Sequence, residues 1–187
     1  ATPLASGVMK DGILPGADLM DMFIGNIGGS MGEISALMLL LGGAYLIIRG
    51  VIRIRIPAAY ILTVAVFSLI FPRGGDVNRF VWMLYEIMGG GLMLGAFFMA
   101  TDYVTSPNTP KGEIIYGVGC GLLVIFIRYF GGYPEGVCYS ILIMNICVWL
   151  IDKYTMPARY GVTKEMKQEA KAKAKAEKLA AKEAAES

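Results

Sequence analysis

Long apolar stretches alternate with short polar connections along most of the chain. Five of them approach the roughly 20 residues that an α-helix needs to cross a bilayer; they cover residues 31–49, 54–71, 80–100, 114–130 and 136–151. The last stretch is short unless its neighbours extend it. Periodicity does not separate one such stretch from a buried helix of a soluble protein, but five in succession do. The pattern therefore predicts an all-α integral membrane protein with about five transmembrane spans.

The apolar stretches also predict three regions. We expect an external segment at residues 1–17, a transmembrane helical domain at 18–155 and a cytoplasmic tail at 156–187 that is rich in Lys, Ala and Glu. The tail is predicted to be a solvated helix, with docking onto a partner or onto anionic lipid as the alternative. The chain begins with Ala and carries no signal-peptide pattern. We expect a truncated or mid-protein start, with a cleaved signal peptide as the alternative.

Positive charge predicts the orientation, because Lys and Arg collect in short cytoplasmic loops. The connection after the first span carries three arginines: Arg49, Arg53 and Arg55. Threading five spans from this side places residues 101–112 and the tail inside, and residues 72–79 and 131–135 outside. The lysine-rich tail agrees with the first loop, although Arg73 and Arg79 fall on the outer side.

Composition excludes several classes of function. Of the 187 residues, 56% are hydrophobic and 17% charged, against roughly 25% charged in soluble domains, so a soluble enzyme is excluded. No basic face exists outside the tail, which excludes nucleic-acid binding as the main role. The chain has no histidine and therefore no His-based metal site or triad. Cys120, Cys138 and Cys147 show no CxxC pairing and are interpreted as buried small hydrophobes, with a disulfide or metal site as the alternative.

Glycine interrupts two apolar segments. Residues 15–33 are short, acidic and broken by glycines, and are interpreted as a half-helix followed by an unwound turn. Residues 80–100 repeat this pattern around Gly89–Gly91. Two Gly-interrupted hydrophobic segments indicate a ligand site built from broken helices, whose N-terminal N–H groups suit an anionic or carbonyl-bearing ligand. The glycines at 117–121 instead favour close helix packing over a dinucleotide fingerprint, because no strand precedes them.

Ionisable residues inside a membrane are costly and therefore functional candidates. Glu33 is placed one turn into the first span and is interpreted as a proton or cation site, or else as a cap of the broken backbone. Glu86 is either functional or faces outward near the interface. Asp102 opens a loop and could be a solvated turn residue, while Asp152 is expected to pair with Lys153. These residues alone leave a transporter, a channel and a cofactor-bearing redox subunit open.

Several longer motifs stand out along the chain. They are Phe-Ile-Gly-Asn-Ile-Gly-Gly-Ser-Met-Gly-Glu-Ile-Ser-Ala at 23–36, Gly-Leu-Met-Leu-Gly-Ala-Phe-Phe-Met-Ala-Thr-Asp at 91–102 with Thr-Ser-Pro at 105–107, Gly-Tyr-Pro-Glu-Gly at 132–136 and Leu-Ile-Met-Asn at 142–145. These motifs and their order resemble the RnfD/NqrB family, the membrane subunits of the Rnf ferredoxin:NAD oxidoreductase and of the sodium-pumping NADH:quinone reductase, with RnfD the nearer. The resemblance covers about residues 1–155. It implies a C-terminal half, the second of two repeats in a urea-transporter-like fold.

The resemblance also implies flavins. The family esterifies FMN to the threonine of a Ser/Thr-Gly-Ala-Thr motif, and the opening Ala-Thr-Pro looks like the end of that motif, which makes Thr2 the flavinylation site. A second flavin, riboflavin, would be shared with the missing N-terminal half. Asn26, Ser30, Asp102 and Thr105 are the candidates for the flavin pocket.

The implied function is that of a membrane electron-transfer subunit in the ion-pumping Rnf complex of the prokaryotic inner membrane. Partners would be the A-, B-, C-, E- and G-type Rnf subunits, which would supply the iron–sulfur clusters and the NAD site, together with membrane lipid. Glu33, Asp102 and Asp152 are implicated in coupling to Na⁺ or H⁺. The alternatives are an NqrB-like subunit of the sodium-pumping NADH:quinone reductase, a urea-type solute channel, and a scaffold subunit that has lost its flavin.

Overall fold

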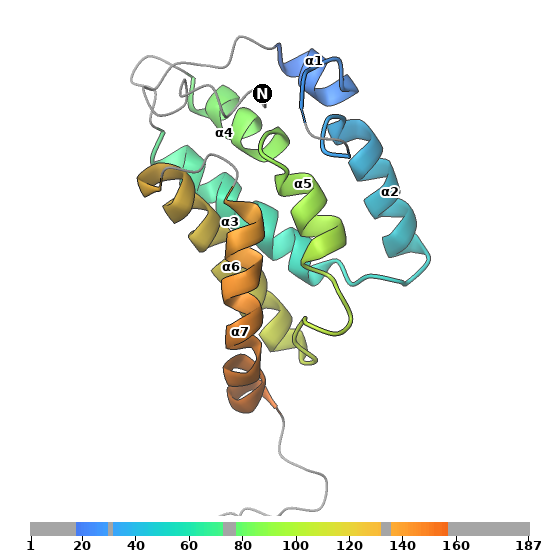
Figure 1. Cartoon of the computed structure of the whole chain (residues 1–187), viewed down its shortest axis with the longest axis vertical. Coiled ribbons are helices and arrows are strands. Elements are labelled where there is room, and N and C mark those ends of the chain that lie inside the picture. Colours follow the sequence, from blue (N-terminus) through green and yellow to red (C-terminus); the bar gives the residue numbers. More distant parts are fainter. Residues whose placement is uncertain (1–17, 30–31, 73–77, 132–135, 157–187) are drawn as a thin grey trace, which may run out of the picture. The chain divides into compact units, whose positions relative to one another are not determined.

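The computed structural model describes residues 18–29, 32–72, 78–131 and 136–156, and within these ranges all regular structure is helical. The predicted external segment and the tail lie outside the described residues. The helices belong to one compact unit that ends at Thr155. Figure 1 shows them in the order α1 (Leu19–Ile24), α2 (Ala36–Ile48), α3 (Arg55–Ile70), α4 (Arg79–Met88), α5 (Leu92–Leu94), the π-helical turn η1 (Gly95–Met99), α6 (Pro110–Phe130) and α7 (Val137–Thr155). The all-helical prediction is confirmed.

The helices differ in whether they are long enough to cross a membrane. Among the described residues, α6 and α7 are long and apolar enough, and α4 with the α5–η1 segment makes a third candidate, bent by 61°. The apolar helices α2 and α3 have 13 and 16 residues. At about 1.5 Å per residue these are shorter than the roughly 30 Å hydrocarbon core. The five predicted segments are thus helical, and two or three of them qualify as spans by length and composition.

The first predicted span begins later than the apolar pattern indicated. Helix α2 starts at Ala36, because Gly32 adopts a left-handed conformation with φ of 93° and the Ser35 hydroxyl caps the helix by accepting from the Met38 amide at 3.3 Å. Glu33 therefore precedes the helix, and its placement one turn inside the span is wrong. Apolarity continues across this turn, so only the cap marks the true start.

The predicted break in the third segment is confirmed. Helix α4 ends at Met88, and Gly90 and Gly91 follow with φ of 65° and 68°. Only glycine adopts this left-handed conformation without a steric penalty. The chain then turns into α5 and η1, whose i→i+5 hydrogen bonding leads to the next connection.

The glycines at 117–121 pack α6 against α3, as predicted. A Cβ atom on Gly117 would lie 2.8 Å from both the Ala59 Cβ and the Ile56 carbonyl oxygen, and one on Gly121 would lie 2.7 Å from the Thr63 Cβ. The two helix backbones therefore approach more closely than any side chain at these positions would allow, which is the typical use of small residues between apolar helices.

Two connections and the end of α7 meet at one end of the unit. The Tyr103 hydroxyl, between η1 and α6, donates to the Val51 carbonyl between α2 and α3. The Asp152 carboxylate, near the end of α7, accepts from the Asn108 amide at 3.2 Å. The threading of the spans predicted that these three segments share one side, and their contacts agree with it.

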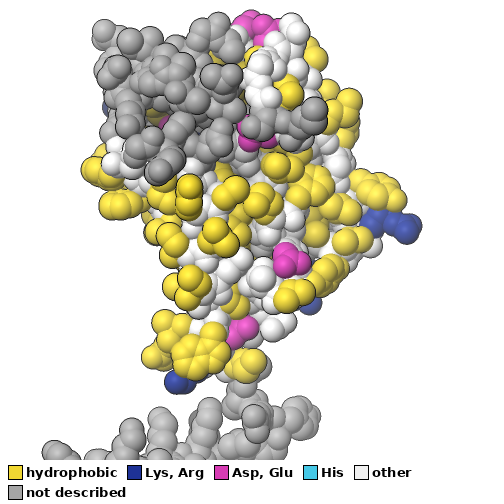
Figure 2. Space-filling model, in the orientation of Figure 1, with side chains coloured by type: hydrophobic (Ala, Val, Ile, Leu, Met, Phe, Trp, Pro, Cys, Tyr) yellow, Lys and Arg dark blue, Asp and Glu magenta, His cyan; other side chains and the backbone are white. Residues whose placement is uncertain are grey.

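The outer surface of the unit is apolar. On the face in Figure 2, hydrophobic side chains are spread over the described surface, whereas Lys and Arg side chains lie only at its margins. Helix α7 contributes Leu142, Ile146 and Trp149, which are exposed to 60%, 82% and 71%. Large apolar side chains on the outside are typical of a helix that faces lipid or another helix rather than water.

Candidate functional site

The two Gly-broken segments meet in the structure. A Cβ atom on Gly91, in the break between α4 and α5, would lie 2.6 Å from Glu33 Oε2, so the carboxylate rests directly against this backbone. Glu33 is half-buried and stands in the non-helical stretch between α1 and α2. The sequence predicted a site built from two broken segments, and the structure brings one acid of the first segment to the break in the second.

The stretch that carries Glu33 is fixed at both ends. Helix α1 ends at Ile24, and Gly25 after it turns the chain back with a φ of 103°. A Cβ atom on Gly25 would lie 2.8 Å from the Ser35 Cβ. The Ser35 hydroxyl lies 3.4 Å from the Phe23 carbonyl oxygen, to which it donates. Met22 of α1 packs into a buried cluster with Trp82 of α4. Glu33 is therefore presented on a short loop whose two ends are packed together.

A buried ion pair involves the last turn of α4, directly before the break. Arg128 of α6 donates to Glu86 Oε2 across 2.6 Å, and both side chains are 3% exposed. The interpretation of Glu86 as an outward-facing residue is wrong. Sequence reasoning missed Arg128, although it is an ionisable residue within the apolar stretch 114–130, the same criterion that selected the acids.

Charge at the break is thus unevenly distributed. Glu86 is neutralised by Arg128, whereas no ion pair joins Glu33 to another part of the chain that the structure describes. Backbone that leaves the helix at membrane depth is stable only where it is buried in protein or lines a cavity. Glu33 therefore supplies a negative charge beside irregular backbone, an arrangement that can bind a cation or a proton.

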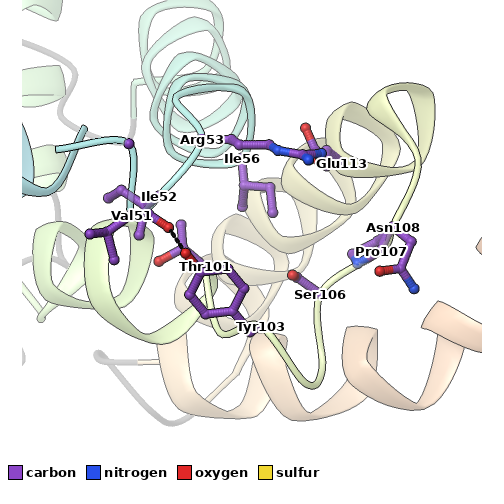
Figure 3. Close-up of a pocket in the computed structure, with 11 residues that line it drawn as sticks. Val51, Ile52, Arg53, Ile56, Thr101, Tyr103, Ser106, Pro107, Asn108 and Glu113 are labelled. Carbon is purple, nitrogen blue, oxygen red and sulfur yellow. Dashed lines mark hydrogen bonds and ion pairs between the residues drawn. The ribbon is translucent and has the colours of Figure 1, made fainter. Parts of the chain in front are cut away.

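A second polar region lies where the two connections meet. A cavity of about 220 Å³ is lined by the α2–α3 connection, the segment after η1 and the start of α6, and Figure 3 shows its lining side chains. Its polar lining comprises Arg53, Thr101, Tyr103, Ser106, Asn108 and Glu113. Glu113 is buried, and its two carboxylate oxygens accept from Arg53 at 2.6 Å and from Arg55 at 3.1 Å. The arginines that predicted the cytoplasmic side thus also hold a buried carboxylate, which the sequence did not indicate.

The remaining predicted acids lie at this end too. Asp102 is exposed and its carboxylate accepts from the Thr105 hydroxyl at 3.2 Å, as a turn residue does. Asp152 is half-buried and accepts from the Asn108 amide. Lys153 instead lies 5.2 Å from the centre of the Trp149 ring. The predicted ion pair between Asp152 and Lys153 is therefore wrong, because the two neighbouring side chains leave the helix in different directions.

The predicted flavin-pocket residues do not converge on one point. Asn26 is exposed and precedes α2, whereas Asp102 and Thr105 lie in the connection that contacts the far end of α2. The length of that helix, about 20 Å for 13 residues, separates the two groups. Thr2 and Ser30 lie outside the described residues.

The cysteines were predicted to be buried hydrophobes. Cys120 is buried, Cys147 is half-buried and Cys138 is exposed, and all three are free thiols. The prediction is correct for Cys120 and wrong for Cys138, which lies near the start of α7 on its outer face. Within the described ranges, no group of three or more Cys, Asp or Glu side chains is arranged to hold a metal ion.

Comparison with known proteins shows to which family the chain belongs. Residues 1–161 match the model of the NQR2, RnfD, RnfE family. The chain belongs to this family. The resemblance to the RnfD branch is confirmed, since relatives at about 50% identity are named as the D-type component of a ferredoxin:NAD(+) oxidoreductase complex.

Two relatives at nearly equal identity differ in the ion that their names give. The chain is 51% identical over 175 residues to the D-type component of the Na(+)-translocating ferredoxin:NAD(+) oxidoreductase complex of Acetobacterium woodii, covering 92% of the chain and 52% of that relative. It is 50% identical over 147 residues to the corresponding component of the proton-translocating ferredoxin:NAD(+) oxidoreductase complex of Clostridium ljungdahlii, covering 78% and 44%.

A third relative is the D-type component of the ion-translocating oxidoreductase complex of Stutzerimonas stutzeri, 43% identical over 149 residues, with coverage of 76% of the chain and 40% of the relative. The chain thus spans about half the length of the curated relatives it matches. Together with its apolar helices, family membership identifies a multi-pass membrane protein.

Proposed function

We propose that this chain is the C-terminal half of an RnfD-type protein, which carries electrons through the membrane within an ion-pumping ferredoxin:NAD oxidoreductase. Family membership and the names of the relatives support the complex. The contact between Glu33 and the break at Gly91 supports the coupled ion movement. In this proposal α2 and α3 join the longer helices as spans, and the five form one repeat of a urea-transporter-like fold.

The electron-carrying group that we propose is FMN, esterified to Thr2. Thr2 lies within the part of the chain that matches the family, and its hydroxyl is what a phosphoester needs. Bound FMN would supply the redox chemistry, and the protein would supply its position. Asn26 and Ser30, which flank the stretch leading to Glu33, are proposed to contact a riboflavin shared with the N-terminal half. Asp102 and Thr105 lie near the other end of α2, so they would contact a flavin there and not together with Asn26 and Ser30.

Glu33 is proposed as the ion-coupling carboxylate. A carboxylate oxygen is a suitable ligand for Na⁺ and a suitable acceptor for H⁺. Asp102 and Asp152, at the opposite end of the unit, would exchange the ion with the cytoplasm. The arginines of the α2–α3 connection place this end of the unit on the cytoplasmic side of the inner membrane in this proposal. The iron–sulfur clusters and the NAD site would lie on the partner subunits of the A, B, C, E and G types.

Covalent flavin is the sharpest test. We would denature the purified full-length protein, separate it on a gel and record flavin fluorescence from its band for the wild type, Thr2→Val and Thr2→Ser. The wild type and Thr2→Ser should fluoresce, since both keep a hydroxyl, and Thr2→Val should be dark. Thr63→Val serves as the control and should remain bright, because the Thr63 hydroxyl donates to the Ala59 carbonyl within α3 and has no proposed role in flavin binding. Fluorescence from the Thr2→Val band would overturn the assignment of Thr2, and a dark wild-type band would favour a solute channel.

A further inference from the structure

Arg128 makes an unusual set of contacts for a residue inside an apolar helix. Its Nη1 donates to the Glu86 carboxylate at 2.6 Å and to the Glu86 carbonyl oxygen at 2.7 Å. Its Nη2 donates to the Gly89 carbonyl oxygen at 3.1 Å and approaches that of Gly90 at 3.4 Å. One buried guanidinium thus faces four oxygen atoms, three of them from the backbone at the end of α4.

These carbonyl groups need a partner because the helix ends there. The last carbonyls of a helix have no amide one turn further on, and a carbonyl without a hydrogen-bond donor is strongly destabilising in a membrane interior. The left-handed Gly90 and Gly91 turn the chain away from the helical path. In transporters with broken helices, unwound carbonyls of this kind hold the transported cation. Here the chain places its own cation among them.

The charges match such a role. Glu86 brings one full negative charge and the three carbonyls add partial ones, while Arg128 brings one positive charge. A planar guanidinium presents its donors from separate nitrogens in a fixed fork, whereas a lysine ammonium presents all three of its donors from one nitrogen. The oxygen cluster is thereby filled and electrically balanced.

We propose that the Arg128 guanidinium acts as an intramolecular counter-cation. It occupies the cluster of oxygen atoms at the end of α4 and stabilises the interruption between α4 and α5. An inorganic ion is kept out of this cluster by the fixed positive charge. Arg128 is a positioning residue, because it acts through the backbone of the break. The proposal depends neither on the flavin nor on the identity of the transported ion.

Chemical rescue tests the proposal directly. We would measure the thermal unfolding of the full-length protein, purified within its complex in detergent, for the wild type, Arg128→Ala and Arg128→Lys. Each protein would be heated in low guanidinium chloride and in sodium chloride of the same ionic strength. Arg128→Ala should melt roughly 10 °C below the wild type. Guanidinium, but not sodium, should restore much of this loss, while the wild type should gain nothing. Arg128→Lys should stay well below the wild type.

Failure of guanidinium to stabilise a folded Arg128→Ala would overturn the proposal, as would wild-type stability of Arg128→Lys. A double variant, Arg128→Met with Glu86→Leu, covers the case in which Arg128→Ala does not fold. If Arg128 were only the counter-ion of Glu86, removing both charges would leave the protein as stable as the wild type. We expect the double variant to remain destabilised or to fail to fold, because the Gly89 and Gly90 carbonyls have lost their donor; wild-type stability would contradict the proposal.

Discussion

Arg53 donates to the carboxylate of Glu113 across 2.6 Å, although the two residues are 60 positions apart in the chain. The Glu113 side chain is 3% exposed, whereas that of Arg53 is 65% exposed. The contact ties the connection before α3 to the first turn of α6. A buried carboxylate here is tolerable only because a positive charge compensates it.

Removal of both arginines should therefore cost more than the sum of the single removals. Arg53→Ala and Arg55→Ala should each lower the free energy of unfolding by about 1 kcal/mol or less, because the other arginine still pairs with Glu113 and both are partly screened by water. The double variant should lose about 3 kcal/mol, since a buried charge is left alone. Chemical unfolding of the full-length protein in mild detergent measures all three. Strict additivity would contradict the shared role of Glu113.

Close packing of α6 on α3 predicts opposite effects of two neighbouring glycine substitutions. Gly117→Ala should destabilise by about 1–2 kcal/mol, because the new methyl group meets the Ile56 carbonyl of α3. Gly119→Ala should be neutral or slightly stabilising, since it meets only the flexible end of Met144 and gains helix propensity. The same unfolding measurement compares the pair. Equal effects would mean that the backbone contact does not limit this interface.

The contact between Gly91 and Glu33 predicts a loss of ion transport that strain alone would not produce. Gly91 and Gly50 both have φ of 68°, but a methyl group on Gly91 would meet the Glu33 carboxylate, and one on Gly50 would meet nothing within 4 Å. Alanine at either position should cost a similar strain of about 1–2 kcal/mol. Only Gly91→Ala should reduce ion translocation by the complex in vesicles, as Glu33→Gln should. A Gly50→Ala variant with the same transport defect would count against the site.

Charge and hydrogen bonding can be separated at Asp152. Asp152→Asn keeps an oxygen that accepts from the Asn108 amide, so its stability should equal that of the wild type. Asp152→Ala should lose about 1 kcal/mol. If Asp152 exchanges the ion with the cytoplasm, both variants should slow translocation in the vesicle assay. Wild-type transport by Asp152→Asn would limit this carboxylate to a structural role.

Much of the helical arrangement was predictable because it follows from local sequence. Apolar stretches locate the helices from α2 to α7, and the consecutive glycines at 89–91 locate the break, since a left-handed backbone there requires them. The close packing at Gly117 was likewise predictable from small residues on an apolar helix. The start of α2 was not, because the hydrophobic pattern runs through its cap.

The side-chain partners at the candidate site were harder to predict from the sequence. Arg128 pairs with Glu86, 42 residues away in sequence. The pairing depends on how α4 and α6 each pack against α3 and not on any local pattern. Asp152 was expected to pair with its neighbour, but the fold offers it an amide 44 residues away. The sequence predicted that the two broken segments form one site. It did not predict that Glu33 contacts Gly91.

The apolar outer face of α7 has a practical consequence for handling the protein. Leu142, Ile146 and Trp149 form a stripe that water would not solvate well. Without a micelle or nanodisc around it, a purified sample should precipitate through exposed apolar surfaces such as this one. The choice of amphiphile, rather than of salt or buffer, should therefore decide whether the isolated protein stays monodisperse.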